Sequence, residues 1–120
     1  MKINVVQNVL DSADAMAALN RKRMTDAGVL AINLLSAPGS GKTTLLQKTL
    51  PALAPEHRSA VLVGDLQTTR DAERLDGVAA EVTQINTGRG CHLSPSQVAR
   101  GMESLALTDV SFLFIENVGN

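Results

Sequence analysis

The stretch Ser-Ala-Pro-Gly-Ser-Gly-Lys-Thr-Thr at residues 36–44 restricts the possible folds of this chain more than any other feature. Residues 30–35, before it, are mostly aliphatic, and residues 44–50, after it, carry leucines at helical spacing. The stretch therefore connects an expected buried strand to an expected helix. Gly39 and Gly41 allow backbone conformations in which successive amide groups face one anion, and the start of the helix adds further unpaired amide groups. This combination predicts a phosphate-binding loop.

The side chains of this loop suit a triphosphate that is bound together with Mg²⁺. Lys42 is long enough to reach the outer phosphates, and the hydroxyl of Thr43 is placed to bind Mg²⁺. The consensus for such loops begins with glycine where this chain has Ser36, but the Gly-Lys-Thr that closes the loop is intact. A plain glycine-rich turn with a solvated lysine is the weaker alternative, because the flanking strand and helix are both as required. The candidate nucleotide-binding residues are Gly39, Ser40, Gly41, Lys42, Thr43 and Thr44.

Two acidic residues, Asp65 and Glu116, each follow an apolar run that is typical of a strand. Ligands of parallel sheets bind beyond the carboxyl ends of the strands, so both acids are expected near the phosphate-binding loop. Either acid could bind Mg²⁺ directly or through water. Lys42, Asp65 and Glu116 are therefore the candidate catalytic residues, and Thr43 with the two acids forms the candidate Mg²⁺ site. Asp65 could instead cap a short helix at residues 69–75, and Glu116 could simply face water.

Strand and helix patterns alternate along the chain and predict its fold class. Hydrophobic residues make up 44% of the 120 residues and aromatic residues only 2%, so aliphatic side chains must fill the core. We predict an α/β fold of the P-loop nucleoside triphosphatase type, with a mostly parallel sheet and helices on both faces. We expect a single nucleotide-binding domain over residues 1–120, with an N-terminal helical segment at 1–28 and a sheet core at 29–120. The sequence stops soon after the last expected strand, which is typical either of a very small protein or of a fragment with an incomplete sheet.

The expected elements follow from hydrophobic spacing and from capping and turn residues. Asp11 or Ser12 is expected to cap the first helix and Gly28 to end it, whereas Ser94 or Ser96 is expected to cap the last one. The expected helices lie at residues 12–27, 42–51 and 69–75 and after Ser94, and the expected strands lie at residues 29–35, 59–64, 82–86 and 110–115.

Composition excludes several classes of function. The net charge is −1 and neither Trp nor Tyr is present, so the chain lacks the basic and aromatic surface that nucleic-acid binding requires. A lone cysteine excludes a disulfide within the chain and suggests the reduced cytoplasm. The sequence contains no apolar run of membrane-spanning length. We therefore expect a soluble cytoplasmic protein that binds neither nucleic acid nor membranes.

A thiol and an imidazole stand side by side in Asn-Thr-Gly-Arg-Gly-Cys-His-Leu at residues 86–93. Cys91 and His92 suit Zn²⁺ or Ni²⁺, but two ligands satisfy only half of a four-coordinate metal. Two protomers related by a two-fold axis would supply four ligands across their interface. From the residues alone, a buried structural cysteine beside a capping histidine is at least as good an interpretation.

Four stretches together resemble the HypB family of hydrogenase maturation GTPases. They are Ser-Ala-Pro-Gly-Ser-Gly-Lys-Thr-Thr-Leu-Leu at 36–46, Gly-Asp-Leu-Gln-Thr-Thr-Arg-Asp-Ala-Glu-Arg at 64–74, Asn-Thr-Gly-Arg-Gly-Cys-His-Leu at 86–93 and Phe-Ile-Glu-Asn-Val-Gly-Asn at 114–120. The resemblance implies a SIMIBI-like P-loop fold and GTP hydrolysis that gates nickel delivery to the large subunit of [NiFe]-hydrogenase. It also implies a nucleotide-dependent homodimer that binds Ni²⁺ or Zn²⁺ through Cys91 and His92, and contacts with other hydrogenase maturation factors.

The chain departs from this family pattern in several places. It has neither an N-terminal cysteine motif nor a histidine-rich tract, and Ser94 and Pro95 stand where the family commonly has an acid. A further family cysteine and the guanine-reading Asn-Lys-x-Asp motif would both come after Asn120, so the chain looks like an N-terminal fragment and its base selectivity is not determined. Three alternatives stay open: a urease-type nickel accessory GTPase, an ATP-dependent small-molecule kinase and a non-catalytic metal-binding module.

Overall fold

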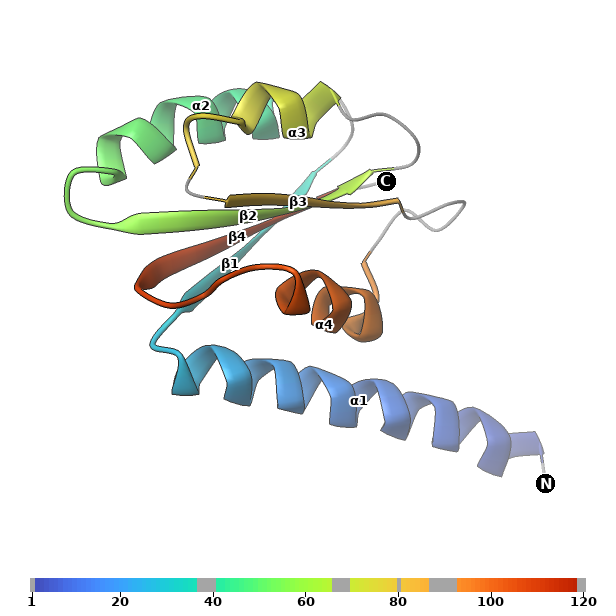
Figure 1. Ribbon diagram of the computed structural model, residues 1–120. Coiled ribbons are helices and arrows are strands. Elements are labelled where there is room, and N and C mark those ends of the chain that lie inside the picture. Colours follow the sequence, from blue (N-terminus) through green and yellow to red (C-terminus); the bar gives the residue numbers. More distant parts are fainter. Residues whose placement is uncertain (1, 37–40, 66–69, 80, 87–92, 119–120) are drawn as a thin grey trace.

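The computed structural model describes residues 2–36, 41–65, 70–79, 81–86 and 93–118 (Figure 1). Helices and strands alternate after a long N-terminal helix, as the sequence predicts. The elements are α1 (Lys2–Asp26), β1 (Leu30–Ser36), α2 (Lys42–Leu53), β2 (Arg58–Asp65), α3 (Arg70–Leu75), β3 (Glu81–Asn86), α4 (Pro95–Glu103) and β4 (Val110–Val118).

The four strands form one parallel sheet in the order β1-β4-β2-β3. Helices α2 and α3 cover one face of the sheet, and α4 and α1 lie on the other (Figure 1). The predicted α/β fold, with a parallel sheet and helices on both faces, is therefore confirmed. Because every strand runs in the same direction, the carboxyl ends of all four meet at one edge, which we call the carboxyl edge.

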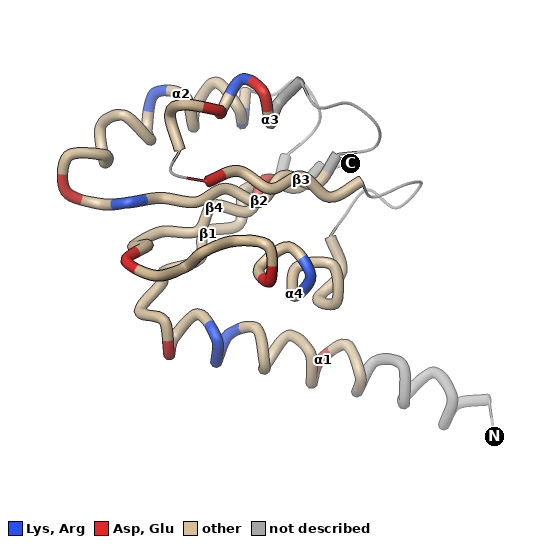
Figure 2. Tube along the Cα trace, viewed as in Figure 1, with Lys and Arg blue, Asp and Glu red and all other residues tan. Residues whose placement is uncertain are grey.

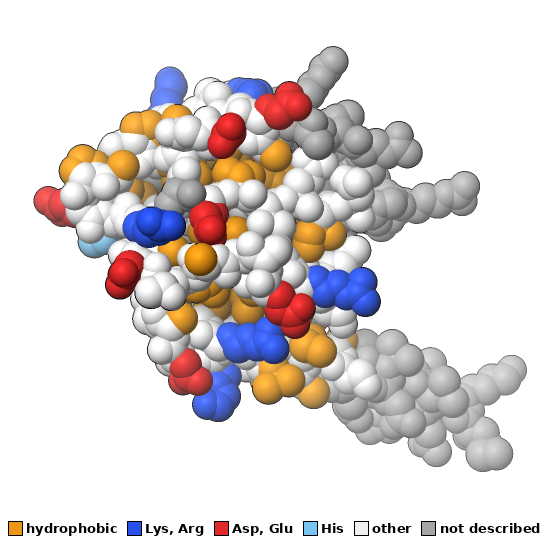
Figure 3. All heavy atoms as spheres, in the orientation of Figure 1, with side chains coloured by type: hydrophobic (Ala, Val, Ile, Leu, Met, Phe, Trp, Pro, Cys, Tyr) orange, Lys and Arg blue, Asp and Glu red, His pale blue; other side chains and the backbone are white. Residues whose placement is uncertain are grey.

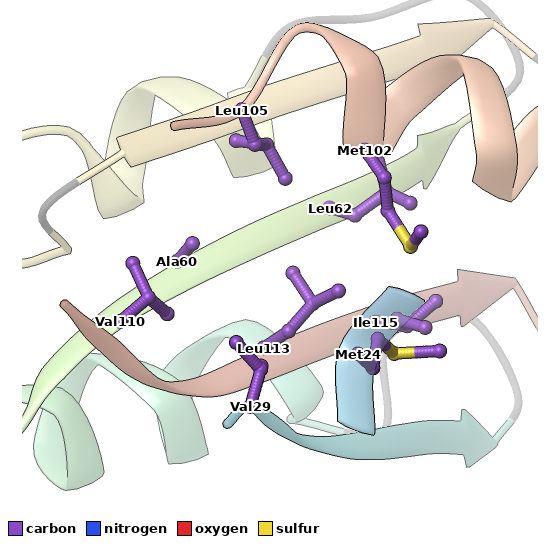
Figure 4. Close-up of a cluster of buried hydrophobic side chains, with 9 residues drawn as sticks. All are labelled: Met24, Val29, Ala60, Leu62, Met102, Leu105, Val110, Leu113 and Ile115. Carbon is purple, nitrogen blue, oxygen red and sulfur yellow. The ribbon is translucent and has the colours of Figure 1, made fainter. Parts of the chain in front are cut away.

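Alternate residues of the central strands build a separate apolar core on each face. Ala60 and Leu62 of β2 face α1 and α4, whereas Val61 and Val63 face α2 and α3, and all four are almost fully buried. Figure 4 shows the first core, in which side chains from α1, α4 and both central strands converge. This core comprises Met24, Val29, Ala60, Leu62, Met102, Leu105, Val110, Leu113 and Ile115.

The predicted start of the first helix was wrong. Helix α1 begins at Lys2 instead of Ser12, and the two expected capping residues lie inside it. No Gly or Pro interrupts the sequence before Gly28, so nothing stops the helix from extending toward the N-terminus. The predicted end at Gly28 is confirmed, with a φ of 71°. There the amide of Val29 donates to Met24 O at 2.8 Å and that of Gly28 to Thr25 O at 3.0 Å, which is a Schellman motif.

The last helix and the last strand also refine the predicted boundaries. Ser94, not Ser96, caps α4: its hydroxyl accepts from the Gln97 amide, and the Gln97 side chain accepts from the Ser94 amide. Strand β4 continues to Val118 because its pairing with β1 continues to Ser36. Glu116 therefore lies within the strand and not after it. The half-buried ring of His57 packs edge-to-face on Phe112, with 5.2 Å between the two ring centroids.

Charged residues of both signs are interspersed over the helices on both faces (Figure 2). The face seen in Figure 3 likewise carries acidic and basic side chains among small apolar groups. The exposed pair Lys22 and Asp26, 3.1 Å apart on α1, is one example, and such pairs contribute only about 0.3–0.5 kcal/mol. None of the described helices combines the length and apolar character that a membrane crossing requires.

Candidate nucleotide-binding site

The predicted phosphate-binding loop connects the carboxyl edge of β1 to the start of α2. Gly39 and Ser40 lie outside the described residues, so the anion cradle itself is not tested. Gly41 is the N-cap of α2 and has φ 99°, ψ 17°, in the left-handed region that favours glycine. Apart from its chain neighbours, no described residue has an atom within 4 Å of where the Gly41 Cβ would be. Among the described residues, the requirement for glycine therefore comes from the backbone conformation and not from crowding. The strand before this loop and the helix after it, both of which the motif needs, are confirmed.

Thr43 and Glu116 are brought together at this edge by α2 and β4. The Thr43 hydroxyl donates to Glu116 Oε1 at 2.8 Å, although the two residues are 73 positions apart in the sequence. Thr43 is 5% exposed and Glu116 is 3% exposed. A buried carboxylate is costly unless it is hydrogen-bonded, and this hydroxyl supplies one such bond. The pair presents two hard oxygen ligands, the type that Mg²⁺ prefers, next to the phosphate-binding motif.

The structure describes two other candidate residues, Lys42 and Asp65, in less detail. Lys42 opens α2 and its side chain is half-buried. Asp65 is the last residue of β2, and its side chain lies outside what the structure describes. Its backbone pairs with Asn86, and Glu116 pairs with Val63 two positions earlier on the same strand. The backbone of Asp65 is therefore at the same edge as Glu116, but a role as Mg²⁺ ligand stays a prediction.

A contact between α3 and the first turns of α2 was not predicted. Arg74 Nη2 donates to Thr44 Oγ1 at 3.0 Å and to Gln47 Oε1 at 2.9 Å, while Gln47 Nε2 donates to the Arg74 carbonyl at 3.2 Å. Thr44, a candidate nucleotide-binding residue, is thus linked to the helix that follows β2. Sequence spacing gave no signal for this contact, because the partners belong to different helices.

The candidate nickel or zinc ligands Cys91 and His92 lie outside the described residues. The structure resumes at Leu93, whose amide donates to Asn117 Oδ1 at 2.8 Å; Asn117 Nδ2 in turn donates to Asn33 Oδ1 at 2.6 Å. Sequence reasoning missed both asparagines. The available signal was a polar residue within each of two apolar strands. Within the described ranges, no group of three or more His, Cys, Asp and Glu side chains could hold a metal ion.

Comparison with known proteins identifies the family. A family model described as "CobW/HypB/UreG, nucleotide-binding domain" matches residues 30–120. The chain belongs to the CobW/HypB/UreG family. Over 118 residues it is 47% identical to the hydrogenase maturation factor HypB of Rhizobium leguminosarum bv. viciae and 45% identical to that of Azotobacter chroococcum mcd 1. These alignments cover 98% of this chain and 40% and 39% of the two relatives.

Solved structures of CobW/HypB/UreG family members share this fold. The crystal structure of HypB from Helicobacter pylori in complex with nickel superposes with a TM-score of 0.82 at 41% identity. The superposition covers 91% of this chain and 52% of that one. The resemblance to HypB and the P-loop fold class are confirmed, and the chain spans about two fifths of the length of these curated relatives.

Proposed function

We propose that this chain is the nucleotide-binding part of a Mg²⁺-dependent GTPase that delivers nickel during [NiFe]-hydrogenase maturation. The observation that supports the proposal most directly is the buried hydrogen bond between Thr43 and Glu116. It joins the phosphate-loop threonine to an acid at the carboxyl edge, in a chain of the CobW/HypB/UreG nucleotide-binding family. Phosphoryl-transfer enzymes of the P-loop class use such a threonine and acid to hold Mg²⁺ and its water.

The described residues fit this chemistry. Thr43 and Glu116 would hold Mg²⁺ through their hard oxygen atoms. We propose Asp65, whose backbone ends β2 at the same edge, as a further ligand. Bound Mg²⁺ would neutralise charge that develops on the phosphate oxygens. Lys42 would place its ammonium against the β and γ phosphates, and the first amides of α2 would point toward the same anion. Asp65 and Glu116 would accept hydrogen bonds from the attacking water and orient it.

Nickel is the proposed cargo, with Cys91 and His92 as its ligands. Thiolate and imidazole suit Ni²⁺ and also Zn²⁺, and two protomers would supply four such ligands at a two-fold interface. A homodimer that forms with nucleotide bound would then couple hydrolysis to metal release. The proposed setting is the cytoplasm, and the proposed partners are other hydrogenase maturation factors and the hydrogenase large subunit.

Titration with GTP and with ATP in the presence of Mg²⁺ tests the nucleotide site. The protein is expected to bind GTP, and Lys42→Ala is expected to weaken that binding about 10-fold or more, because a charged contact to the phosphates is lost. Lys48→Ala is the matched control, since Lys48 lies on the same helix and is exposed. Equal affinity for GTP and ATP would refute guanine selectivity. Binding of neither nucleotide would refute the proposed function.

Glu116→Gln separates binding from hydrolysis. The amide has the same shape as the carboxylate and still accepts the Thr43 hydrogen bond, so the fold should be retained. We expect GTP hydrolysis to fall about 100-fold or more, because the charge that orients water is removed. Hydrolysis at the unchanged rate would show that Glu116 has no part in the reaction.

A further inference from the structure

Asn117 follows Glu116 on β4, and the two side chains point to opposite faces of the sheet, as neighbouring residues of a strand do. Glu116 contacts Thr43 of α2 on one face. Asn117 contacts the amide of Leu93, just before α4, on the other face. One strand therefore carries a contact to the candidate nucleotide site and, one residue later, a contact to the segment that contains Cys91 and His92.

The orientation of the Asn117 amide is fixed by its partners. The backbone N–H of Leu93 can only donate, so the atom facing it at 2.8 Å must be the carbonyl oxygen of Asn117. The Asn117 NH₂ group then faces Asn33 of β1 and donates to its Oδ1 at 2.6 Å. Asn117 is only 7% exposed, so losing either bond would leave a buried polar atom without that partner. A buried amide held in this way positions the backbone of Leu93 relative to β4.

A second contact holds Leu93 against β2. A Cβ placed on Gly64 would lie 2.8 Å from Leu93 Cγ and 3.1 Å from both of its methyl carbons. The leucine side chain therefore rests on bare backbone, and no larger residue at position 64 leaves this space. Of the two residues that contact Leu93, Gly64 directly precedes Asp65 and Asn117 directly follows Glu116. Leu93 is thus held by two central strands, each beside a proposed Mg²⁺ ligand.

We propose that Asn117 is a positioning residue that couples the nucleotide site to the metal-binding pair Cys91 and His92. Leu93 is bonded covalently to His92, so the position of Leu93 fixes the position of one end of the metal-binding segment. A change in the Thr43–Glu116 contact when nucleotide and Mg²⁺ bind shifts this end of β4, and the hydrogen bond from Leu93 to Asn117 transmits the shift. Linkage requires the reverse effect as well: bound nickel must change nucleotide affinity by the same factor. This inference rests on the proposed function.

Nickel affinity measured in two nucleotide states tests the coupling. The protein is titrated with Ni²⁺ in the presence of GDP and, separately, of a non-hydrolysable GTP analogue. Wild type is expected to show a ratio of nickel dissociation constants between the two states of about fivefold or more. Asn117→Ala should bring this ratio to within about twofold of unity, because the link to Leu93 is lost, while affinity for the GTP analogue without nickel changes less than about threefold.

Asn117→Asp distinguishes positioning from a general structural role. It keeps the acceptor for the Leu93 amide, and the exposed Asn33 amide can turn to donate to it, so the ratio should stay close to that of wild type. Hydrogen exchange at the Leu93 amide reports the bond directly. Protection should be lost in Asn117→Ala and retained in Asn117→Asp.

Gly64→Ala gives an independent route to the same result. It displaces Leu93 without changing Asn117, so it should also reduce the ratio, and it decides the question if Asn117→Ala does not fold. A nucleotide-dependent ratio that survives both substitutions would overturn the inference and leave the proposed function intact. Equal nickel affinity of wild type in both states would overturn the inference too. If wild type bound neither GTP nor nickel, the proposed function would fail and the inference with it.

Discussion

Replacing Thr43 by valine tests the contact on which the candidate site depends. Valine has nearly the shape of threonine and is also branched at Cβ, so neither the packing nor the helix preference at this position changes much. The substitution removes one hydroxyl, and with it the hydrogen bond of 2.8 Å to Glu116 Oε1. Both residues are buried, so water cannot easily replace the lost donor.

The expected cost follows from the type of bond that is lost. Hydrogen bonds to charged groups contribute about 1.5–3 kcal/mol, whereas neutral ones contribute about 0.5–1.5 kcal/mol. We therefore expect Thr43→Val to lower the free energy of unfolding by about 1.5–3 kcal/mol. In a Glu116→Gln background the same change should cost only about 0.5–1.5 kcal/mol, because the acceptor is then neutral.

Urea denaturation of the four proteins of this double-mutant cycle, without nucleotide or Mg²⁺, measures the difference. The coupling energy is expected to be about 1 kcal/mol or more, above the uncertainty of such cycles. Thr43→Ser is the control, since it keeps the hydroxyl and loses one methyl group worth about 0.8 kcal/mol. A Thr43→Val protein within about 0.5 kcal/mol of wild type would refute the conclusion that this hydroxyl stabilises a buried carboxylate.

Three further substitutions test how the elements around the site are held. Gly101→Ala places a methyl group against Leu62 Cδ1 and 3.0 Å from Ile85 Cδ1. Overpacking of about 1–3 kcal/mol should outweigh a helix gain of at most about 1 kcal/mol, so the free energy of unfolding should fall. In a Leu62→Ala background Gly101→Ala should cause no such loss, and a stabilised single variant would contradict the close packing of α4 on β2. Ser94→Ala should lower the free energy of unfolding by about 1 kcal/mol, whereas Ser94→Asp should not, because only the alanine variant loses the α4 cap. Equal denaturation midpoints for the alanine and aspartate variants would count against the cap. Gly28→Ala should cost about 1–2 kcal/mol through its left-handed backbone, since no described residue beyond its chain neighbours lies within 4 Å of the added Cβ. An unchanged thermal unfolding midpoint would argue against the Schellman end of α1.

Local patterns predicted most of the elements in this chain. The phosphate-binding motif contains its own strand, turn and helix signals, so the end of β1 and the start of α2 were predicted closely from the sequence. The end of α1 at Gly28 was equally local, because a glycine after an amphipathic helix supplies the left-handed residue that such an end requires. The start of α1 was missed for a related reason: Asp11 and Ser12 are typical capping residues, but the residues before them are also compatible with a helix, and capping preference does not override continuation.

The arrangement of the strands could not be predicted in the same way. The order β1-β4-β2-β3 inserts the last strand between the first two, and hydrophobic spacing carries no information about which strands are neighbours. The same limit applied to Thr43 and Glu116. Each was predicted separately as a Mg²⁺ ligand, but their direct hydrogen bond is a consequence of strand order and of the register between β1 and β4.

Asn33 and Asn117 show what kind of signal was overlooked. A polar side chain in an apolar strand is costly to bury unless it is hydrogen-bonded, so the buried Asn117 required partners that the sequence could not name. The exposed Asn33 is one of those partners. Side chains alternate between the two faces of β4, which places Glu116 on the side of α2 and Asn117 on the side of α4. A slip of one residue in the register of β4 would exchange these positions, with the carboxylate against Leu93 and the amide against Thr43. The large apolar side chains that precede them, Phe114 for one core and Ile115 for the other, oppose such a slip, so the same packing that stabilises the sheet also assigns the two polar residues to their faces.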